Sequence, residues 1–347
     1  MAGPALDEAA SDAMPADAST ARRGLVVLAL AGALAVVCVA SIVLGSQRIG
    51  PDSVWAGLVT GEGDAGAIVR DMRIPRTVVG LAVGAALGIA GALIQGFTRN
   101  PLADPGILGV NAGASLGVVV GLAFFGVASA SGYIWFSFAG AIVATVLVYL
   151  IGSAGGRAPD ALRMTLSGVA LGAVMGGVVA AIGLLNPRVF DSMRSWNVGS
   201  LTAIAADAYT VLPFLAAGIV IAFCLAPSLN ALALGDDLAT ALGSRVVLTR
   251  ILSIVAVTLL CGAATAAAGP VAFVGLMVPH VVRWMVGPHQ GWILAGTLFA
   301  APLLLLAADV VGRLVLPTGE LPVSIVTSVI GAPVLIALVR RRNASAL

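Results

Sequence analysis

The chain has 347 residues, of which 60% are hydrophobic and only 10% are charged, and its mean hydropathy is +1.08. This composition excludes an ordinary soluble globular domain and indicates a polytopic membrane protein. The formal net charge of +2 is too small to suggest nucleic acid as a partner.

The N-terminal segment, residues 1–23, carries four acidic side chains among small residues and shows no apolar periodicity. We expect it to be a disordered cytoplasmic tail. The apolar run that follows is too long for the core of a cleaved signal sequence, so we interpret it as a retained helix. Residues 24–342 are predicted to form a single transmembrane domain.

Ten apolar windows follow one another along the chain. A helix needs roughly 20 apolar residues to cross the hydrocarbon of a bilayer. The windows predict an all-α protein with spans at about 24–45, 75–96, 107–128, 133–153, 164–185, 207–228, 247–268, 271–286, 292–312 and 321–341. Only Gly269-Pro270 separates the seventh window from the eighth.

An even number of spans places both termini on the same side of the membrane. All eighteen basic residues are arginines, and cytoplasmic segments carry an excess of positive charge. With both ends inside, the inner segments hold Arg22, Arg23, Arg99, Arg157, Arg163, Arg245, Arg250, Arg283, Arg340, Arg341 and Arg342. The outer segments then hold Arg48, Arg70, Arg73, Arg76, Arg188, Arg194 and Arg313. The bias favours cytoplasmic termini and leaves an unusual amount of positive charge outside.

Small residues recur within the spans, as at Gly84 and Gly88 and again at Gly172, Gly176 and Gly177. Such patterns let helix backbones approach closely, so we expect tight packing within the chain. Three cysteines, Cys38, Cys224 and Cys261, lie in apolar spans without metal-ligand spacing and are expected to be buried small hydrophobes.

Catalytic chemistry finds little support in the sequence. The chain has two histidines, His280 and His289, and no span holds a pair of carboxylates. A phosphate-binding GxxxxGK[ST] loop is absent from the sequence, so any ATPase must be a separate chain. We predict a protein that is not an enzyme and needs no cofactor or resident metal.

Ionisable residues within the spans are few. Asp207 falls at the edge of its window, and Asp309 precedes Arg313 by one turn, in the order that favours an ion pair. No carboxylate stands alone in the middle of a span, which argues against a proton-coupled carrier. Neither a secondary transporter nor an ion channel is excluded outright, although no ring of charges suited to a selectivity filter is evident.

The segment 233–243 lies between the sixth and seventh windows. Its Leu234, Leu238, Ala241 and Leu242 recur at the spacing of a short amphipathic helix. Asp236 and Asp237 near its start complement the helix dipole, and Gly243 follows its end as a C-terminal cap residue would.

A polar hairpin, Asn100-Pro101-Leu102-Ala103-Asp104-Pro105-Gly106, separates the second and third windows. Together with the RIPR motif at Arg73 and the segments Leu184–Leu201, Ala266–Gly287 and Gly319–Arg342, it resembles the permease subunits of ABC importers for iron-siderophores, haem and vitamin B12. The resemblance extends from about Arg70 to Arg342 and is closest to the ferric-enterobactin permease branch.

The resemblance implies a type II ABC importer permease fold in a bacterial cytoplasmic membrane. The expected cargo is a ferric siderophore, of catecholate type, with vitamin B12 or haem as alternatives. The expected partners are ATP-binding cassette subunits, an extracytoplasmic substrate-binding protein and a second permease chain, either identical or homologous.

Site residues follow from the same resemblance. Arg73, Arg76 and Arg313 are expected to form an exposed basic rim that receives glutamates of the binding protein. The segment expected to dock into the ATPase comprises Leu234, Gly235, Asp236, Asp237, Leu238, Ala239, Ala241, Leu242 and Gly243. The family's signature loop is matched by Asn100, Pro101, Asp104, Pro105 and Gly106.

Overall fold

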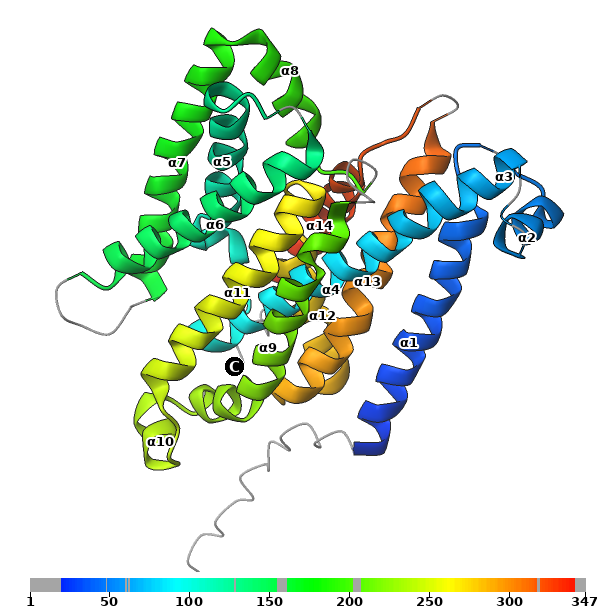
Figure 1. Ribbon diagram of the computed structural model, residues 1–347. Helices are drawn as coiled ribbons and strands as arrows, with labels where there is room; N and C mark the ends of the chain where they lie inside the picture. The colour runs from blue at the N-terminus through cyan, green and yellow to red at the C-terminus, as the bar shows by residue number, and fades with distance from the viewer. Residues whose placement is uncertain are drawn as a thin grey trace, which may run out of the picture.

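The computed structural model describes residues 20–47, 49–59, 61, 63–127, 129–154, 161–201, 207–316 and 319–340. Across these ranges the chain is helical and has no strand (Figure 1). The expected tail lies outside the described residues as far as residue 19. Residues 20–23 belong to the first helix instead of the tail.

Ten helices occupy the positions of the ten predicted windows. They are α1 (Thr20–Val43), α4 (Ile74–Thr98), α5 (Val110–Phe124), α6 (Ala130–Gly152), α7 (Ala161–Leu185), α9 (Leu212–Ala233), α11 (Val246–Ala268), α12 (Val274–Val286), α13 (Gln290–Val315) and α14 (Val323–Arg340). Seven helices in the described part of the chain are long and apolar enough to cross a membrane, and α5, α12 and α14 are shorter apolar helices. The predicted division between the seventh and eighth windows is confirmed at residues 269–273.

Several short helices connect these elements. They are α2 (Pro51–Val59), α3 (Gly63–Ala67), the π-helix η1 (Ile68–Arg73), the 3-10 helices η2 (Pro105–Leu108) and η3 (Asp207–Val211), α8 (Pro187–Trp196) and α10 (Asp236–Ala241). Of these, only α10 was expected from its apolar spacing. Helices α8 and α10 lie at opposite ends of the bundle, and α2 and α3 lie at the end that carries α8 (Figure 1).

Helix α4 forms the centre of the bundle. It packs against α9, α11, α12 and α13, and 83% of its most apolar window is buried, against 11% in α1. A Cβ at Gly84 would lie 2.6 Å from the backbone of Pro302 in α13, and one at Gly91 would collide with the Gly275 carbonyl at the start of α12. The expected close packing is therefore confirmed along α4, where glycine lets two neighbouring backbones approach.

Helices α5, α6 and α7 form a second group that packs side by side (Figure 1). The glycines at 176 and 177 of α7 make no such close contact, because a Cβ at either position would meet no described atom within 4 Å. The cysteine prediction is confirmed for Cys261, which is buried, and is wrong for Cys224, which is exposed on the outside of the helix bundle. Cys38 is half-buried.

Candidate functional site

One end of the bundle carries α10, the core of the segment 233–243. Gly235 precedes the helix with a φ of 106°, and Gly243 follows it with a φ of 83°, conformations that L side chains rarely adopt. Asp236 and Asp237 occupy the first turn, as predicted. The two glycines therefore let the chain leave α9, form a single short helix and turn into α11.

Asp236 fastens α10 to two transmembrane helices. Its carboxylate accepts hydrogen bonds from Arg250 Nη2 in α11 at 2.9 and 3.1 Å, and from Arg99 Nη2 at the end of α4 at 3.3 Å. Asp237 is exposed and has no ion pair among the described residues. The sequence pattern does not distinguish the two aspartates, whereas of the two only Asp236 forms ion pairs with other described residues.

An apolar stripe on this segment points away from the bundle. Leu234, Leu238 and Leu242 are 60%, 57% and 66% exposed, whereas Ala239 is fully buried. Leu238 lies within α10, and Leu234 and Leu242 lie just before and just after it, so the three exposed leucines are carried by one short segment. Exposed large apolar side chains grouped beside charged residues are typical of surfaces that contact another protein or a membrane.

The signature loop leads directly into this region. Arg99 ends α4 in the left-handed conformation at a φ of 52°, and its side chain then reaches Asp236. Asn100 accepts the Leu102 N–H at 3.0 Å, and Asp104 accepts the Gly106 N–H at 2.7 Å. The polar side chains of the loop therefore shape its two turns, and Arg99, just before the loop, connects α4 with the α10 segment, a contact that sequence spacing does not reveal.

Arg73 lies at the opposite end of α4 and caps α1. Its guanidinium donates to the carbonyl oxygens of Ile42 at 2.8 Å, Val43 at 2.6 Å and Gln47 at 2.7 Å. The last carbonyls of a helix have no partner within the helix and carry partial negative charge. Arg73 satisfies these groups and holds the end of α1 against α4.

Arg313 makes a second attachment to the same end of α1. Its guanidinium donates to the Ser41 carbonyl at 2.9 Å and to the Leu44 carbonyl at 3.0 Å, and it also lies 3.1 Å from the Asp309 carboxylate. The predicted pair between Asp309 and Arg313 is therefore confirmed. Through it, α13 is tied to α1.

Arg76 joins α4 to α13 and to the connection that follows it. The guanidinium makes a bidentate contact with Asp309, with Nη2 and Oδ1 2.7 Å apart, and its Nη1 donates to Glu320 Oε2 at 2.6 Å. Glu320 also accepts the Ser46 hydroxyl at 2.9 Å. We refer to Arg73, Arg76, Arg313, Asp309 and Glu320 as the arginine cluster.

The expectation that these three arginines form an exposed rim is wrong. Arg73, Arg76 and Arg313 are only 5%, 8% and 3% exposed. The carboxylate partners of Arg76, which are Asp309 and Glu320, lie more than 200 residues away from it along the chain, so spacing could not predict its burial. The cluster nevertheless borders a pocket of about 150 Å³, whose wall includes all three arginines together with Asp71 and Glu320.

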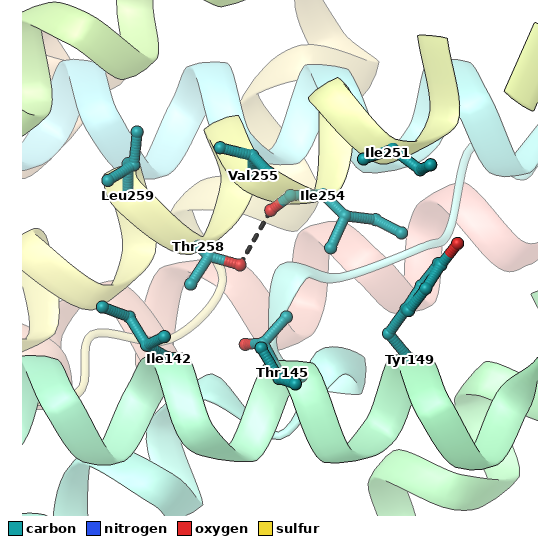
Figure 2. A pocket seen from close by; sticks show the side chains of 9 residues that line it. Ile142, Thr145, Tyr149, Ile251, Ile254, Val255, Thr258 and Leu259 are labelled. Carbon is teal, nitrogen blue, oxygen red and sulfur yellow. Dashed lines mark hydrogen bonds between the residues drawn. The ribbon is translucent and has the colours of Figure 1, made fainter. Parts of the chain in front are cut away.

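A different pocket, of about 300 Å³, lies between α6 and α11 (Figure 2). The hydroxyl of Thr258 donates to the Ile254 carbonyl at 2.7 Å, and that of Thr145 donates to the Ala141 carbonyl at 2.9 Å. The rest of its wall is aliphatic apart from Tyr149. This pocket lacks a charged group along its wall and does not suit a charged ligand.

The helix bundle is that of a multi-pass membrane protein, and its likeness to a solved ABC transporter gives it the fold of a type II ABC importer permease. Residues 33–341 match the model of the FecCD transport family, and the chain belongs to that family. A solved metal-chelate type ABC transporter in an inward-facing conformation superposes with a TM-score of 0.80 at 26% identity, covering 92% of this chain and 99% of that one.

Two bacterial permease proteins are similar to this chain over most of its length. The ferric enterobactin transport system permease protein FepD of Escherichia coli K12 is 49% identical over 91% of this chain and 96% of its own length. The "Probable siderophore transport system permease protein YfiZ" of Bacillus subtilis 168 is 35% identical over 89% of this chain and 93% of its own length. These are permeases, so the chain belongs with transport subunits and not with enzymes.

Proposed function

We propose that this chain is the transmembrane permease of an ATP-driven importer for ferric siderophores of the catecholate type. The chelate is received from a binding protein outside the cell and released into the cytoplasm. The similarity to FepD and YfiZ supports the choice of cargo. The single observation that carries the proposed mechanism is the exposed leucine stripe of the α10 segment.

The α10 segment is the part of the chain that engages a separate ATPase subunit. An apolar stripe flanked by Asp237 suits insertion into a groove of a folded partner, because burying three leucines on docking is favourable. This assignment places the α10 end, and with it both chain termini, on the cytoplasmic side. Since one permease offers one such segment and an ATPase dimer offers two grooves, the working unit contains two permease chains and two ATPase chains.

Asp236 would transmit a displacement of α10 to the transmembrane helices. Its contacts with Arg99 and Arg250 connect the docking segment to the ends of α4 and α11. Helix α4 is also the most buried span, so displacement at its end reaches the packing surfaces of α9, α12 and α13. A rigid helix linked to a docked partner is a physical route for coupling ATP hydrolysis to opening of the pathway.

The arginine cluster would receive the binding protein at the outer end. A carboxylate of the partner can enter the adjoining pocket and compete with Glu320 for Arg76, because Glu320 is the partly exposed member of that ion pair. Removing Glu320 by Glu320→Ala should therefore tighten docking of the loaded binding protein and increase its salt dependence. Asp191→Ala, on exposed α8 and outside the pocket, is the matched control.

Uptake in cells tests the proposed function. A strain deleted for this gene should lose accumulation of a radiolabelled ferric catecholate, and the gene in trans should restore it. Accumulation of vitamin B12 or haem lost in place of the ferric chelate would assign the permease to the alternative cargo. Uptake that continues after depletion of ATP would contradict an ABC importer and favour a channel or a secondary transporter.

A further inference from the structure

A third pocket, of about 530 Å³, lies at the α8 end of the bundle between α5, α6 and α8. Its volume falls in the range of about 300–1,000 Å³ that is usual for small-molecule sites. Apolar side chains of α5 form part of its wall, and α8 contributes residues from its start to its end. Helix α8 lies at the end of the bundle opposite α10 (Figure 1).

The polar groups of this pocket suit an anion. Arg188 is exposed, lines the pocket and has no hydrogen bond or ion pair among the described residues. The described residues that form the pocket wall include no aspartate or glutamate. The carboxamide oxygen of Asn186 caps α8 by accepting the Val189 N–H at 3.4 Å, which leaves the amide N–H groups of that side chain to donate to a ligand.

Two aromatic side chains complete the wall. Tyr133 of α6 is half-buried, and Trp196 at the end of α8 is 7% exposed. The indole Nε1–H of Trp196 is buried and has no acceptor among the described residues. Since the Nε1 atom is buried, it is other atoms of Trp196 that line the pocket.

We propose that this pocket is the first binding site for the ferric chelate on the permease, an inference that rests on the function proposed above. Arg188 pairs with the negative charge of the chelate, and the rings of Tyr133 and Trp196 contact its aromatic groups. The site thus selects an anionic, aromatic metal chelate over a neutral one of similar size.

Direct binding tests this assignment. The permease–ATPase complex, without ATP or binding protein, is placed in phosphatidylcholine nanodiscs and titrated with a radiolabelled ferric tricatecholate. Loss of a charge-assisted contact should make Arg188→Ala bind about tenfold more weakly. Arg194→Ala is the matched control, because Arg194 is exposed on the same helix but lies outside the pocket. Wild-type affinity in Arg188→Ala, or equal weakening in Arg194→Ala, would overturn the site.

Trp196→Phe replaces the indole by a smaller ring and reduces the aromatic contact area on the pocket wall, so it should weaken binding severalfold. Trp135→Phe, at an exposed tryptophan of α6 outside the pocket, should leave affinity unchanged. A neutral ferric hydroxamate should bind the wild type and Arg188→Ala equally. A loss of hydroxamate binding as large as the loss of catecholate binding would contradict recognition by charge.

An anionic lipid headgroup could also pair with Arg188. A second set of nanodiscs, made with a different lipid, distinguishes the chelate from the lipid as the ligand. Chelate affinity should change less than twofold when phosphatidylglycerol replaces phosphatidylcholine, whereas competition by phosphatidylglycerol would assign the pocket to lipid. The outcomes also separate this site from the proposed function. If the wild-type complex transports the chelate and Arg188→Ala binds it normally, the proposed pocket is wrong but the proposed function stands. If the wild-type complex transports no ferric chelate, the proposed function itself is wrong.

Discussion

Arg76 of α4 and Asp309 of α13 are 233 residues apart and form a buried ion pair, with Nη2 of Arg76 2.7 Å from Oδ1 of Asp309 and Nε 3.0 Å from Oδ2. Asp309 also lies 3.1 Å from Arg313, so a single carboxylate, 1% exposed, accepts two guanidinium groups. Its loss would leave two buried arginines without their principal counter-charge. The pair therefore holds α4 and α13 together at the end that carries the arginine cluster.

Asp309→Asn should destabilise the permease by about 3–5 kcal/mol, the cost of breaking a buried ion pair by removing one partner. Denaturant titration of the purified protein in mild detergent measures the change in free energy of unfolding. Asp191→Asn, at an exposed position of α8, is the control and should change it by less than about 0.5 kcal/mol. Equal stability of the two variants would contradict a structural role for the pair.

Glu320 should make the stability of the protein depend on pH. Burial raises the pKa of the Glu320 carboxyl. The hydrogen bond and the charge of Arg76, together with the hydrogen bond from the Ser46 hydroxyl, lower this pKa by more than burial raises it, so it lies below its ordinary value. A carboxylate with a lowered pKa stabilises the folded state above the pKa of the unfolded chain, and this stabilisation is lost as the pH falls through the folded pKa.

The comparison of wild type with Glu320→Gln detects this contribution. The wild type should melt at a higher temperature at pH 7, and the difference should shrink as the pH falls below about 4.5, near the ordinary glutamate pKa. A difference in melting temperature that stays constant from pH 7 to pH 3 would show that the Glu320 charge contributes nothing to stability.

Asp236 and Asp237 should respond differently to replacement. Asp236→Ala removes both contacts that fasten α10 to Arg99 and Arg250 and should reduce ATP-driven uptake severalfold. Its effect on stability should stay near or below about 1 kcal/mol, because these side chains are partly exposed. Asp237→Ala should retain most of the uptake. Equal uptake by the two variants, at matched amounts in the membrane, would contradict a transmitting role for Asp236.

Gly91 and Gly176 provide a matched pair of helix glycines. Alanine is favoured over glycine in a helix by about 1 kcal/mol, so Gly176→Ala, which meets no described atom within 4 Å, should not destabilise the protein. Gly91→Ala would collide with the Gly275 carbonyl and should cost about 1–3 kcal/mol, despite the same gain in propensity. Thermal melting of both variants measures the contrast. A stable Gly91→Ala variant would show that α4 and α12 can separate.

The sequence predicted the spans within a few residues because a membrane helix must be continuously apolar over a fixed length. The pairing of Asp309 with Arg313 was also predictable, since it is local. Burial of Arg73 and Arg76 was not, because α1, Asp309 and Glu320 meet them only in the folded bundle. The contact of Arg99 with Asp236 depends likewise on where α4 and α10 end in space.

The short connecting helices escaped prediction for a related reason. Helix α8 has ten residues, and only its capping asparagine and the proline at its start signal it locally. Since the pocket beside α8 takes its walls from three helices, no sequence pattern marks it as a site. Local chemistry thus predicts the helices, while sites assembled from distant helices require the packed structure.

The most direct test of the account is the initial rate of ferric catecholate uptake into proteoliposomes that contain the permease, its ATPase and the loaded binding protein. Uptake should require both ATP and the binding protein. Leu238→Glu should abolish uptake while the protein remains folded, because Leu238 is 57% exposed on the docking stripe. Uptake without ATP, or wild-type rates with Leu238→Glu, would contradict it.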